Sequence, residues 1–451
     1  MHNKHRNHVH ARLTHPRDMG RYLAAVAGVL GCAGVAFAQG SPNDHANDPA
    51  FVVHSAPVCP GPANVGTARC HAWVVTDANG VPRATGVNDN AAGPNGGRGS
   101  HGGGGGGSST KPPPPPAGAY GTRQFQTAYG LAGSTSNGAT VAIVDAYDNP
   151  TIEQDLTVYS NAYGLPSCTS KNGCFKKVDQ KGSTNYPRAN SGWALEIALD
   201  VQAVHAVCPD CRILLIEARS SSLGNLLAAE SYAESRADVV VVSNSWGAGE
   251  FSSEAAYDGY FNYGKPVTVS SGDSGYGVEW PAASAFVTAV GGTTLILNSD
   301  TNTRSSESVW KGSGSGCSAY EAQPDWQTSV LTTAQMSGCS HRIVADVAAD
   351  ADPATGAAVY DSYGYAGQKG WFTVGGTSLS APIIAAVYAL NQNTEGVGVL
   401  YTNSSQLFDV TSGYNGTSCG DKTTDTYYLC HAGTGYDGPT GLGTPDGLAA
   451  F

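Results

Sequence analysis

The chain has few charged residues, and the acidic ones outnumber the basic ones. Only 13% of its 451 residues are Asp, Glu, Lys or Arg, and the formal net charge is −12 at pH 7. A protein that binds nucleic acid needs clustered cationic side chains for the phosphates. The composition therefore argues against a nucleic-acid partner, and it leaves little positive self-repulsion at low pH.

The sequence also lacks any long apolar run after its N-terminal region. The apolar run from Tyr22 to Ala38 is short, follows basic residues and ends in the small-x-small pattern Ala36-Phe37-Ala38. This pattern is typical of a secretory signal peptide, residues 1–38, and less so of a transmembrane anchor. A lipoprotein signal would use Cys32, but the residues around it fit that motif imperfectly. We therefore predict a secreted protein without a membrane span.

The cysteines form neighbouring couples. Cys208-Pro209-Asp210-Cys211 has no second Cys-x-x-Cys beside it, so a structural disulfide is favoured over a redox-active or zinc-binding pair. Outside the predicted signal peptide there are ten cysteines, an even number that in an oxidising compartment favours short-loop disulfides. The expected couples are Cys59/Cys70, Cys168/Cys174, Cys208/Cys211, Cys317/Cys339 and Cys419/Cys430.

A low-complexity stretch, residues 90–118, divides the chain. It contains a run of glycines, 102–107, and five consecutive prolines, 112–116. Such a stretch cannot bury a core, so we interpret it as a linker that is flexible and then stiff. The organisation predicted is a short N-terminal (pro)segment over 39–89, the linker, and one large domain over 119–451.

Within 119–451 short apolar runs rich in β-branched residues alternate with helical patterns. Strands buried on both faces have this composition, and their alternation with helices predicts an α/β fold with a mainly parallel central sheet. Ligands of such sheets bind beyond the carboxyl ends of the strands. The expected strands are 140–145, 212–217, 238–243, 266–270 and 285–290, and the expected helices are 192–207 and 223–236.

Two acidic residues lie in the helix predicted over 192–207. Almost every other position of that helix is apolar, which predicts a buried helix. Glu196 and Asp200 are four residues apart and so share one face. Two close buried carboxylates cannot both ionise cheaply, so at least one pKa should be raised. The alternative is a capping or salt-bridging pair, although no basic residue stands at helical spacing.

A serine that could act as a nucleophile stands in a glycine-rich turn before an apolar helix. Ser378 follows Gly375-Gly376-Thr377 and precedes Pro382. A serine nucleophile needs a base, and a carboxylate base works in acid, where imidazole is protonated. The alternative is a helix N-cap, a common use of serine. Asp273 lies in a second polar turn, Ser271 to Gly275, and could simply be a turn former.

Three motifs carry a resemblance to a known family. Glu196-x-x-x-Asp200, Ser271-Gly272-Asp273-Ser274-Gly275 and Gly376-Thr377-Ser378-Leu379-Ser380-Ala381-Pro382 have the order and approximate spacing of the sedolisins, the serine-carboxyl peptidases. The resemblance runs from about Thr140 to the C-terminus. It implies a three-layer subtilisin-like α/β fold and a secreted, acid-acting endopeptidase whose partners are protein or peptide substrates.

The same resemblance implies a role for each motif residue. Ser378 would be the nucleophile, Glu196 its general base and acid, and Asp200 the partner that orients Glu196. Asp273 would line the oxyanion hole, where only its protonated form can donate a hydrogen bond. Asp145 would be an outer member of the carboxyl chain, or else a loop acid.

Two loops near the C-terminus combine aspartates with glycines. Carboxylate and carbonyl oxygens are ligands that suit Ca²⁺. The loops are similar to the sedolisin calcium site, which implies one structural Ca²⁺, whereas the residues alone also fit a loop without metal. The implied ligands are the side chains of Asp409 and Asp437 and the carbonyls of Val410, Gly433 and Gly435.

Two other interpretations stay open. One is a subtilisin-type triad of Asp145, Ser378 and His205, although His205 lacks the His-Gly-Thr setting of that class. The other is a catalytically inactive secreted binding protein on the same fold. The segment 39–89 is short for a sedolisin propeptide, and Gly375 stands where the family often has serine. We expect a monomer, and the sequence does not indicate substrate preference.

Overall fold

The computed structural model describes residues 53–86 and 114–451, which belong to one compact unit, Val53–Phe451. The predicted signal peptide and most of the predicted linker lie outside the described residues. Among the helices that are described, none combines the length and apolarity needed to cross a membrane.

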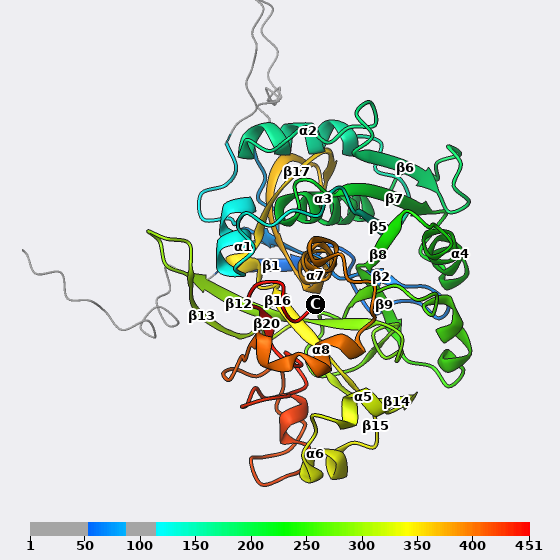
Figure 1. Cartoon of the computed structure of the whole chain (residues 1–451). Helices are drawn as coiled ribbons and strands as arrows, with labels where there is room; N and C mark the ends of the chain where they lie inside the picture. Colours follow the sequence, from blue (N-terminus) through cyan, green and yellow to red (C-terminus); the bar gives the residue numbers. More distant parts are fainter. Residues whose placement is uncertain (1–52, 87–113) are drawn as a thin grey trace, which may run out of the picture. The chain divides into compact units, whose positions relative to one another are not determined.

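An eight-stranded sheet forms the centre, in the order β13-β12-β10-β8-β5-β7-β6 with β16 also paired to β12 (Figure 1). All of its pairings are parallel except that of β12 with β13. The mainly parallel sheet predicted from the apolar runs is therefore confirmed. Its strands are β5 (Thr140–Ala146), β6 (Phe175–Asp179), β7 (Arg212–Ala218), β8 (Val239–Asn244), β10 (Val267–Ser270), β12 (Thr288–Leu297), β13 (Arg304–Val309) and β16 (Val347–Asp350).

Helices cover this sheet. Helix α3 (Ser191–Val207) contacts β5 and helix α7 (Thr377–Asn391), and α7 contacts β8, β10 and β12. Helix α4 (Leu223–Glu234) contacts β5, β7 and β8 and lies on the other side of these strands in Figure 1. The side chain of Asn190 caps α3 by accepting from the N–H groups of Gly192 and Trp193, both at 3.1 Å. From Gly192 onward the whole of α3 is buried, as its sequence predicts.

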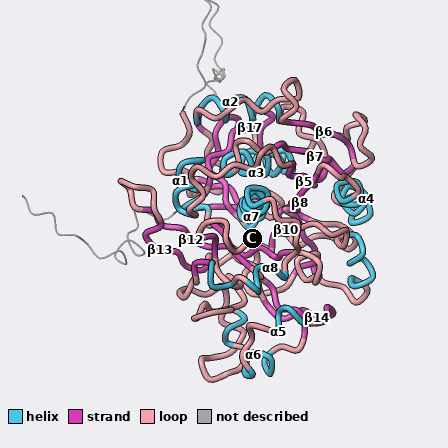
Figure 2. Tube along the Cα trace, viewed as in Figure 1, coloured by secondary structure: helices cyan, strands magenta, loops and turns pink. Residues whose placement is uncertain are grey.

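Shorter helices fill the connections, as the tube in Figure 2 shows. They are α1 (Thr122–Ala128), α2 (Ile152–Tyr163), α5 (Asp325–Thr328), α6 (Thr333–Gly338), α8 (Gly398–Thr402) and the 3₁₀ turns η3 (Glu254–Tyr260), η4 (Pro353–Thr355), η5 (Ser404–Gln406) and η6 (Tyr427–Leu429).

A second, antiparallel sheet joins the segment 53–86 to two strands within 357–375. Its order is β1-β3-β18-β17, with β4 also paired to β18. The segment 53–86 thus pairs with the strand that leads into α7, a connection that the sequence did not reveal. The strands are β1 (His54–Pro57), β3 (Trp73–Thr76), β4 (Thr85–Gly86), β17 (Ala357–Tyr365) and β18 (Gln368–Gly375).

Three small sheets complete the described fold. One has the order β11-β9-β2, and the others are the pairs β14-β15 and β19-β20. Every pairing in them is antiparallel. Their strands are β2 (Arg69–Cys70), β9 (Trp246–Gly249), β11 (Glu279–Trp280), β14 (Gly316–Ala322), β15 (His341–Val344), β19 (Leu407–Phe408) and β20 (Thr444–Pro445).

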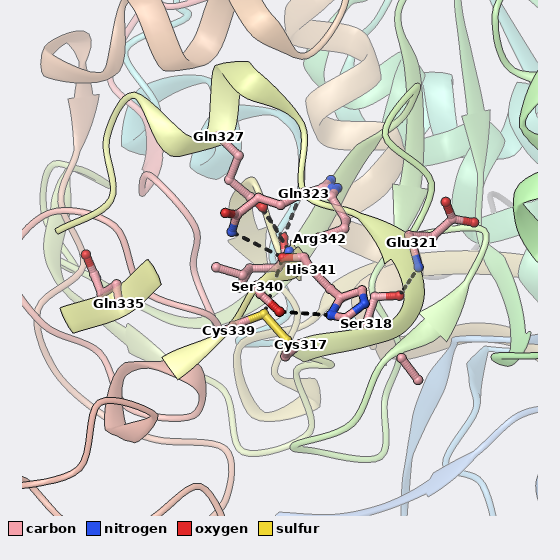
Figure 3. The surroundings of a disulfide bond; sticks show 12 residues. Cys317, Ser318, Glu321, Gln323, Gln327, Gln335, Cys339, Ser340, His341 and Arg342 are labelled. Atoms are coloured by element: carbon pink, nitrogen blue, oxygen red, sulfur yellow. Dashed lines mark hydrogen bonds between the residues drawn. A yellow bond between two sulfur atoms is a disulfide. The ribbon is translucent and has the colours of Figure 1, made fainter. Parts of the chain in front are cut away.

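The five disulfides predicted from neighbouring cysteines are all present. Figure 3 shows Cys317–Cys339, which joins β14 to the residue after α6. Beside it the Gln327 side chain donates to the carbonyl oxygen of Ile343 at 2.8 Å. Such cross-links stabilise a fold mainly by restricting the unfolded chain.

Candidate active site

Several polar side chains gather where the parallel strands end. Asp145 lies in β5 near its carboxyl end, Ser245 follows β8 and Asp273 follows β10. Adjacent parallel strands present their carboxyl ends at one edge of the sheet. The Ser245 hydroxyl donates to Asp200 Oδ1 at 2.9 Å, and the Ser378 hydroxyl donates to the Ser245 carbonyl oxygen at 3.3 Å. Ser245 therefore links α3 to the first turn of α7.

Three carboxyl groups at this edge are fully buried. Asp145, Glu196 and Asp200 all have 0% exposure. Burial raises the pKa of Asp145 to about 8. Burial, followed by the charge of Asp145, raises the pKa of Glu196 and of Asp200 well above their usual values. Because no cation compensates these groups among their leading interactions, more than one of them is neutral at acidic pH.

Glu196 and Ser378 are close but do not form a well-aligned hydrogen bond. Neither oxygen of Glu196 has a partner of good hydrogen-bond geometry. The Ser378 hydroxyl and the Ala72 N–H are nevertheless near enough to favour the charged form of Glu196, against the larger effects of burial and of Asp145 on its pKa. Catalytic hydrogen bonds are often long before the reacting complex forms. The serine hydroxyl can thus turn from the Ser245 carbonyl to the Glu196 carboxyl.

Asp273 has one occupied and one free oxygen. Oδ1 accepts from the N–H and from the hydroxyl of Thr377, both at 2.8 Å. Oδ2 is buried without a partner. Burial raises the pKa of Asp273 to about 6, although His71, Thr377 and Arg69 act in the opposite direction. Below that pH the carboxyl is mostly neutral, and Oδ2 is the oxygen free to carry the proton.

Gly376 keeps open the space in front of Asp273. Its φ is +94°, a conformation that favours glycine. A Cβ there would collide with the carbonyl oxygen of His71 and would lie 2.8 Å from Asp273 Oδ2. The N–H of Ser378 donates to the same His71 carbonyl at 3.2 Å. Position 376 therefore requires glycine, because the carbonyl group of His71 lies between Ser378 and Asp273 and leaves no room for a Cβ.

His205, the histidine of the alternative triad, lies elsewhere. It is buried, and its Nε2 lies 3.1 Å from the carbonyl oxygen of Pro166. Burial lowers its pKa to about 4. It stands nine residues beyond Glu196 on α3, which at 1.5 Å per residue is about 14 Å along the axis. Helix α3 thus carries the glutamate to Ser378 and the histidine away from it.

The structure brings the two predicted calcium-loop aspartates together. Asp437 Oδ2 accepts from the N–H of Gly433 at 3.1 Å, and Asp409 Oδ2 accepts from the N–H of Gly435 at 2.9 Å. Asp409 Oδ1 is buried without a partner. Burial, with a further contribution from Asp409, raises the pKa of Asp437 to about 8 against its hydrogen bonds with Thr440 and Gly433. Two facing carboxylates with a free buried oxygen fit a hard cation such as Ca²⁺.

Another group of metal-binding residue types does not fit a metal. The side chains of Cys419, Cys430 and His431 bring their ligand atoms within 4.8 Å of one another. The two sulfurs form a disulfide, however, and a cysteine binds metal as a thiolate. We therefore assign this cluster to the disulfide and its packing.

Two residues beside Ser378 were missed in the sequence. His71 lies in the N-terminal segment and Glu279 in β11, and neither stands in a motif. Their side chains meet at 2.9 Å although 208 positions separate them. The polar turn Ser271 to Gly275 after β10 indicated a site at this edge of the sheet, but no local signal pointed to this pair.

The fold and the buried serine–carboxyl arrangement define the wider class to which the chain belongs. The model of the subtilase family (Peptidase_S8) matches residues 182–404. The solved structure of Pseudomonas sedolisin, a serine-carboxyl proteinase complexed with two molecules of pseudo-iodotyrostatin, superposes with a TM-score of 0.61 at 30% identity. That match covers 73% of this chain and 95% of the other. The predicted subtilisin-like fold is thereby confirmed.

Curated relatives agree with the structural match. Sedolisin of Pseudomonas sp. (strain 101) is 30% identical over 373 residues, which cover 72% of this chain and 59% of that protein. Kumamolisin of Bacillus sp. (strain MN-32) is 31% identical over 360 residues, which cover 72% of this chain and 61% of that protein. The chain thus spans about three fifths of the length of these relatives. It belongs to the sedolisin family of serine-type peptidases.

Proposed function

We propose that the protein is a secreted, acid-acting serine-carboxyl endopeptidase that hydrolyses protein or peptide substrates. The observation that carries this proposal is the position of Ser378. Its hydroxyl lies beside a buried carboxyl group, Glu196, and its N–H faces the same space as the free oxygen of Asp273. Membership of the sedolisin family supports the same reaction.

In the first half of the reaction Ser378 Oγ attacks the carbonyl carbon of the peptide bond. Glu196 accepts the hydroxyl proton, and the carbonyl oxygen becomes an oxyanion. The Ser378 N–H and the protonated Asp273 donate to that oxyanion, where charge develops. Glu196 then gives its proton to the departing nitrogen, and the C–N bond breaks to leave an acyl-enzyme on Ser378.

In the second half water hydrolyses the ester. Glu196 takes a proton from the water as its oxygen attacks the acyl carbon, and it returns the proton to Ser378 Oγ as the ester bond breaks. Asp200 orients Glu196 through the shared face of α3, and Ser245 holds Asp200 by its hydrogen bond. Burial keeps the pKa of both carboxyl groups raised, and Asp145 adds to this where it is itself ionised.

A structural Ca²⁺ is part of the proposal. Asp409 and Asp437 would hold it with their carboxylates, and Val410, Gly433 and Gly435 would contribute backbone carbonyls. The unpartnered Asp409 Oδ1 supports this assignment. A bound cation supplies charge compensation for the facing carboxylates.

The remaining proposals concern secretion, domain organisation and oligomeric state. We propose that residues 1–38 direct secretion, that 39–89 form a short (pro)segment before the 90–118 linker, and that 119–451 carry the peptidase domain and act as a monomer. Five disulfides suit an oxidising extracellular compartment.

The test is peptidase activity on a denatured protein substrate from about pH 2 to pH 8, a range that spans carboxyl and histidine titration. We expect an acid optimum that Ser378→Ala abolishes and Glu196→Gln reduces by about 10²–10⁴-fold. His205→Gln, which keeps a donor for Pro166, is the matched control and should stay active. Activity that rises toward neutral pH, survives Glu196→Gln and disappears in His205→Gln would establish the histidine triad instead. Absence of Ser378-dependent turnover at every pH would favour the binding protein.

A further inference from the structure

The chain's own N-terminal segment lies across the candidate active site as an extended strand. Strand β2 pairs antiparallel with β9. On that side the N–H of His71 donates to the Ser245 carbonyl oxygen at 3.2 Å, and on the other side the N–H of Ala68 donates to the Ser221 carbonyl oxygen at 2.7 Å. Backbone hydrogen bonds thus hold the segment from both sides, which is how a cleft binds an extended peptide regardless of its side chains.

The peptide bond between His71 and Ala72 lies at the reacting groups. The carbonyl oxygen of His71 accepts from the N–H of Ser378 at 3.2 Å, beside the free oxygen of Asp273. The N–H of Ala72 faces the carboxyl of Glu196. The carbonyl therefore occupies the place where an oxyanion would form, and the nitrogen faces the group that would protonate it. The His71–Ala72 bond therefore lies where the scissile bond of a substrate peptide would lie.

The side chain of His71 fills a pocket next to this bond. It is 1% exposed, with Nδ1 2.7 Å from Ser270 Oγ and Nε2 2.9 Å from Glu279 Oε2. A Cβ on Gly247 would lie 2.6 Å from the imidazole, and a Cβ on Gly272 would lie 3.3 Å from the Glu279 carboxyl. Glycine backbone thus forms two walls of the pocket, and a carboxylate lies against the end of the bound side chain.

Glu279 is matched to positive charge. Its other oxygen, Oε1, lies 2.8 Å from Arg69 Nη2, two residues before His71. Burial alone would raise its pKa, but the charges and hydrogen bonds of His71 and Arg69 outweigh burial and lower the pKa to about 2. Within 4.0 Å and among the described residues, Arg69 and His71 are the basic side chains that pair with it. Without the segment, the carboxylate would face an open pocket uncompensated.

This proposal rests on the proposed function. We propose that this pocket selects a cationic side chain in the residue on the N-terminal side of the cleaved bond. Glu279 is then the specificity-determining residue, and His71–Ala72 is the bond that the enzyme cuts in its own chain. Hydrolysis there adds one water and leaves a carboxyl group on His71 and an amino group on Ala72. The disulfide Cys59–Cys70 lies wholly before the bond, so it does not tether the two products.

Cleavage would also leave the catalytic domain intact. Strand β3 begins at Trp73 and pairs with β18, so it stays with the domain after the cut. The fragment that ends at His71 would keep the β2–β9 and β1–β3 pairings and no covalent link. A cavity of about 490 Å³ between the segment and the pocket, lined by Pro62, Arg69 and Glu279 among others, lies along the surface that would separate.

The experiment has two readouts on the full chain. After incubation at pH 4, mass spectrometry should find a new N-terminus at Ala72 in wild type and an intact chain in Ser378→Ala. The processed enzyme is then given peptides that differ only in the residue before the scissile bond: Arg, Lys, His, Gln, Leu or Glu. We expect kcat/KM to be at least tenfold higher for Arg and Lys than for Gln and Leu.

Variants at Glu279 decide the role of the pocket. Glu279→Gln should reduce the ratio of kcat/KM for the Arg peptide to kcat/KM for the Gln peptide by tenfold or more. The control Glu250→Gln alters an acid that bonds Ser318 instead, and it should keep the preference. An unselective wild type, or a preference that survives Glu279→Gln, would overturn the role of Glu279.

The two proposals fail in different ways. An intact His71–Ala72 bond in active wild type would overturn self-cleavage at this place. Cleavage sites mapped in a denatured protein give an unbiased check, because Ser378-dependent cuts scattered after apolar residues would refute the selection of cations while the peptidase stands. Absence of any Ser378-dependent cut would refute the proposed function itself.

Discussion

Two sets of buried carboxyl groups lie at the candidate active site, and their surroundings give them opposite charge states. Asp145, Glu196 and Asp200 face one another without a cation, and burial raises their pKa. Glu279 is also buried, but Arg69 and His71 lower its pKa to about 2. Desolvation alone favours the neutral acid, whereas a paired cation restores the charge. The first set can hold and move a proton, and the second can recognise positive charge.

Burial alone therefore does not determine the role of an acidic side chain. The loop aspartates Asp409 and Asp437 are a third case, because they lie close together like Glu196 and Asp200 but in a loop of glycines rather than on a helix. The carboxylates of Asp409 and Asp437 suit a metal ion taken up from solution rather than a basic side chain of the protein. The partner of each carboxyl decides what it does.

After the losses expected for Ser378 and Glu196, the largest effect is expected at Asp273, whose free oxygen acts only while protonated. Asp273→Leu removes the donor and should lower kcat/KM at pH 4 by about 10²–10³-fold. Asp273→Asn keeps a donor at every pH, so it should retain more activity and extend it above pH 6, where wild type loses the proton. Profiles of kcat/KM from pH 3 to pH 8 measure both. Identical alkaline limbs for wild type and Asp273→Asn would contradict this assignment.

The two sets should also contribute to stability with opposite signs. An acid whose pKa rises on folding stabilises the fold fully below its unfolded pKa, and this contribution is lost as pH rises through the folded value. Asp145, at about 8, and Asp273, at about 6, should thus lower the free energy of unfolding between pH 4 and pH 8 by several kcal/mol, most of it from Asp145. Denaturant unfolding of Ser378→Ala, which cannot digest itself, measures the change.

Glu279 supplies the control for that titration. Its lowered pKa stabilises the fold above about pH 4.5, and this contribution is lost as pH falls toward about 2. Glu279→Gln in the Ser378→Ala background should therefore flatten the decline in stability below pH 4 and leave the decline above pH 6 unchanged. A stability that rises steadily from pH 4 to pH 8 would mean that the buried acids are paired in ways that the structure does not contain.

A smaller effect should follow from calcium. Free Ca²⁺ at a hundred times its Kd should stabilise Ser378→Ala by about 2.7 kcal/mol, and EGTA should remove the gain. Asp437→Asn should abolish the response, whereas Asp421→Asn, at an exposed loop acid, should keep it. Thermal unfolding with and without the ion measures the difference. If EGTA leaves the Tm unchanged, the facing carboxylates compensate their charge by protonation alone.

The smallest effect is expected at Asp145, whose pKa of about 8 leaves it neutral over the acidic range. Asp145→Asn exchanges a neutral carboxyl group for a neutral amide, so the acidic limb of kcat/KM should stay in place. Asp155→Asn, at a buried acid of α2 that bonds Thr151, is the control and should not move the limb either. A limb that moves down in Asp145→Asn would mean that Asp145 is ionised in acid, where its charge raises the pKa of Glu196.

Much of the fold could be predicted because the signals are local. Strand β5 is apolar between Thr140 and Asp145 and is buried at every position, and α3 is mostly apolar and is buried from Gly192 onward. The prediction was less accurate at β12, which begins at Thr288 rather than at 285 and continues to Leu297. Its second half pairs antiparallel with β13 and is partly exposed, so a continuous apolar run does not mark it.

By itself the sequence determined the strands, the buried helix, the five disulfide couples and the polar turns at the ends of the strands, because each depends on residues near one another in the chain. Only the tertiary structure decided that His71 meets Glu279 and that the Ala72 N–H lies near Glu196. Those contacts join segments about 200 and 120 positions apart along the chain, and no periodicity spans such a distance. Charge states follow the same division, since a carboxyl group keeps its proton or loses it according to neighbours that only folding supplies.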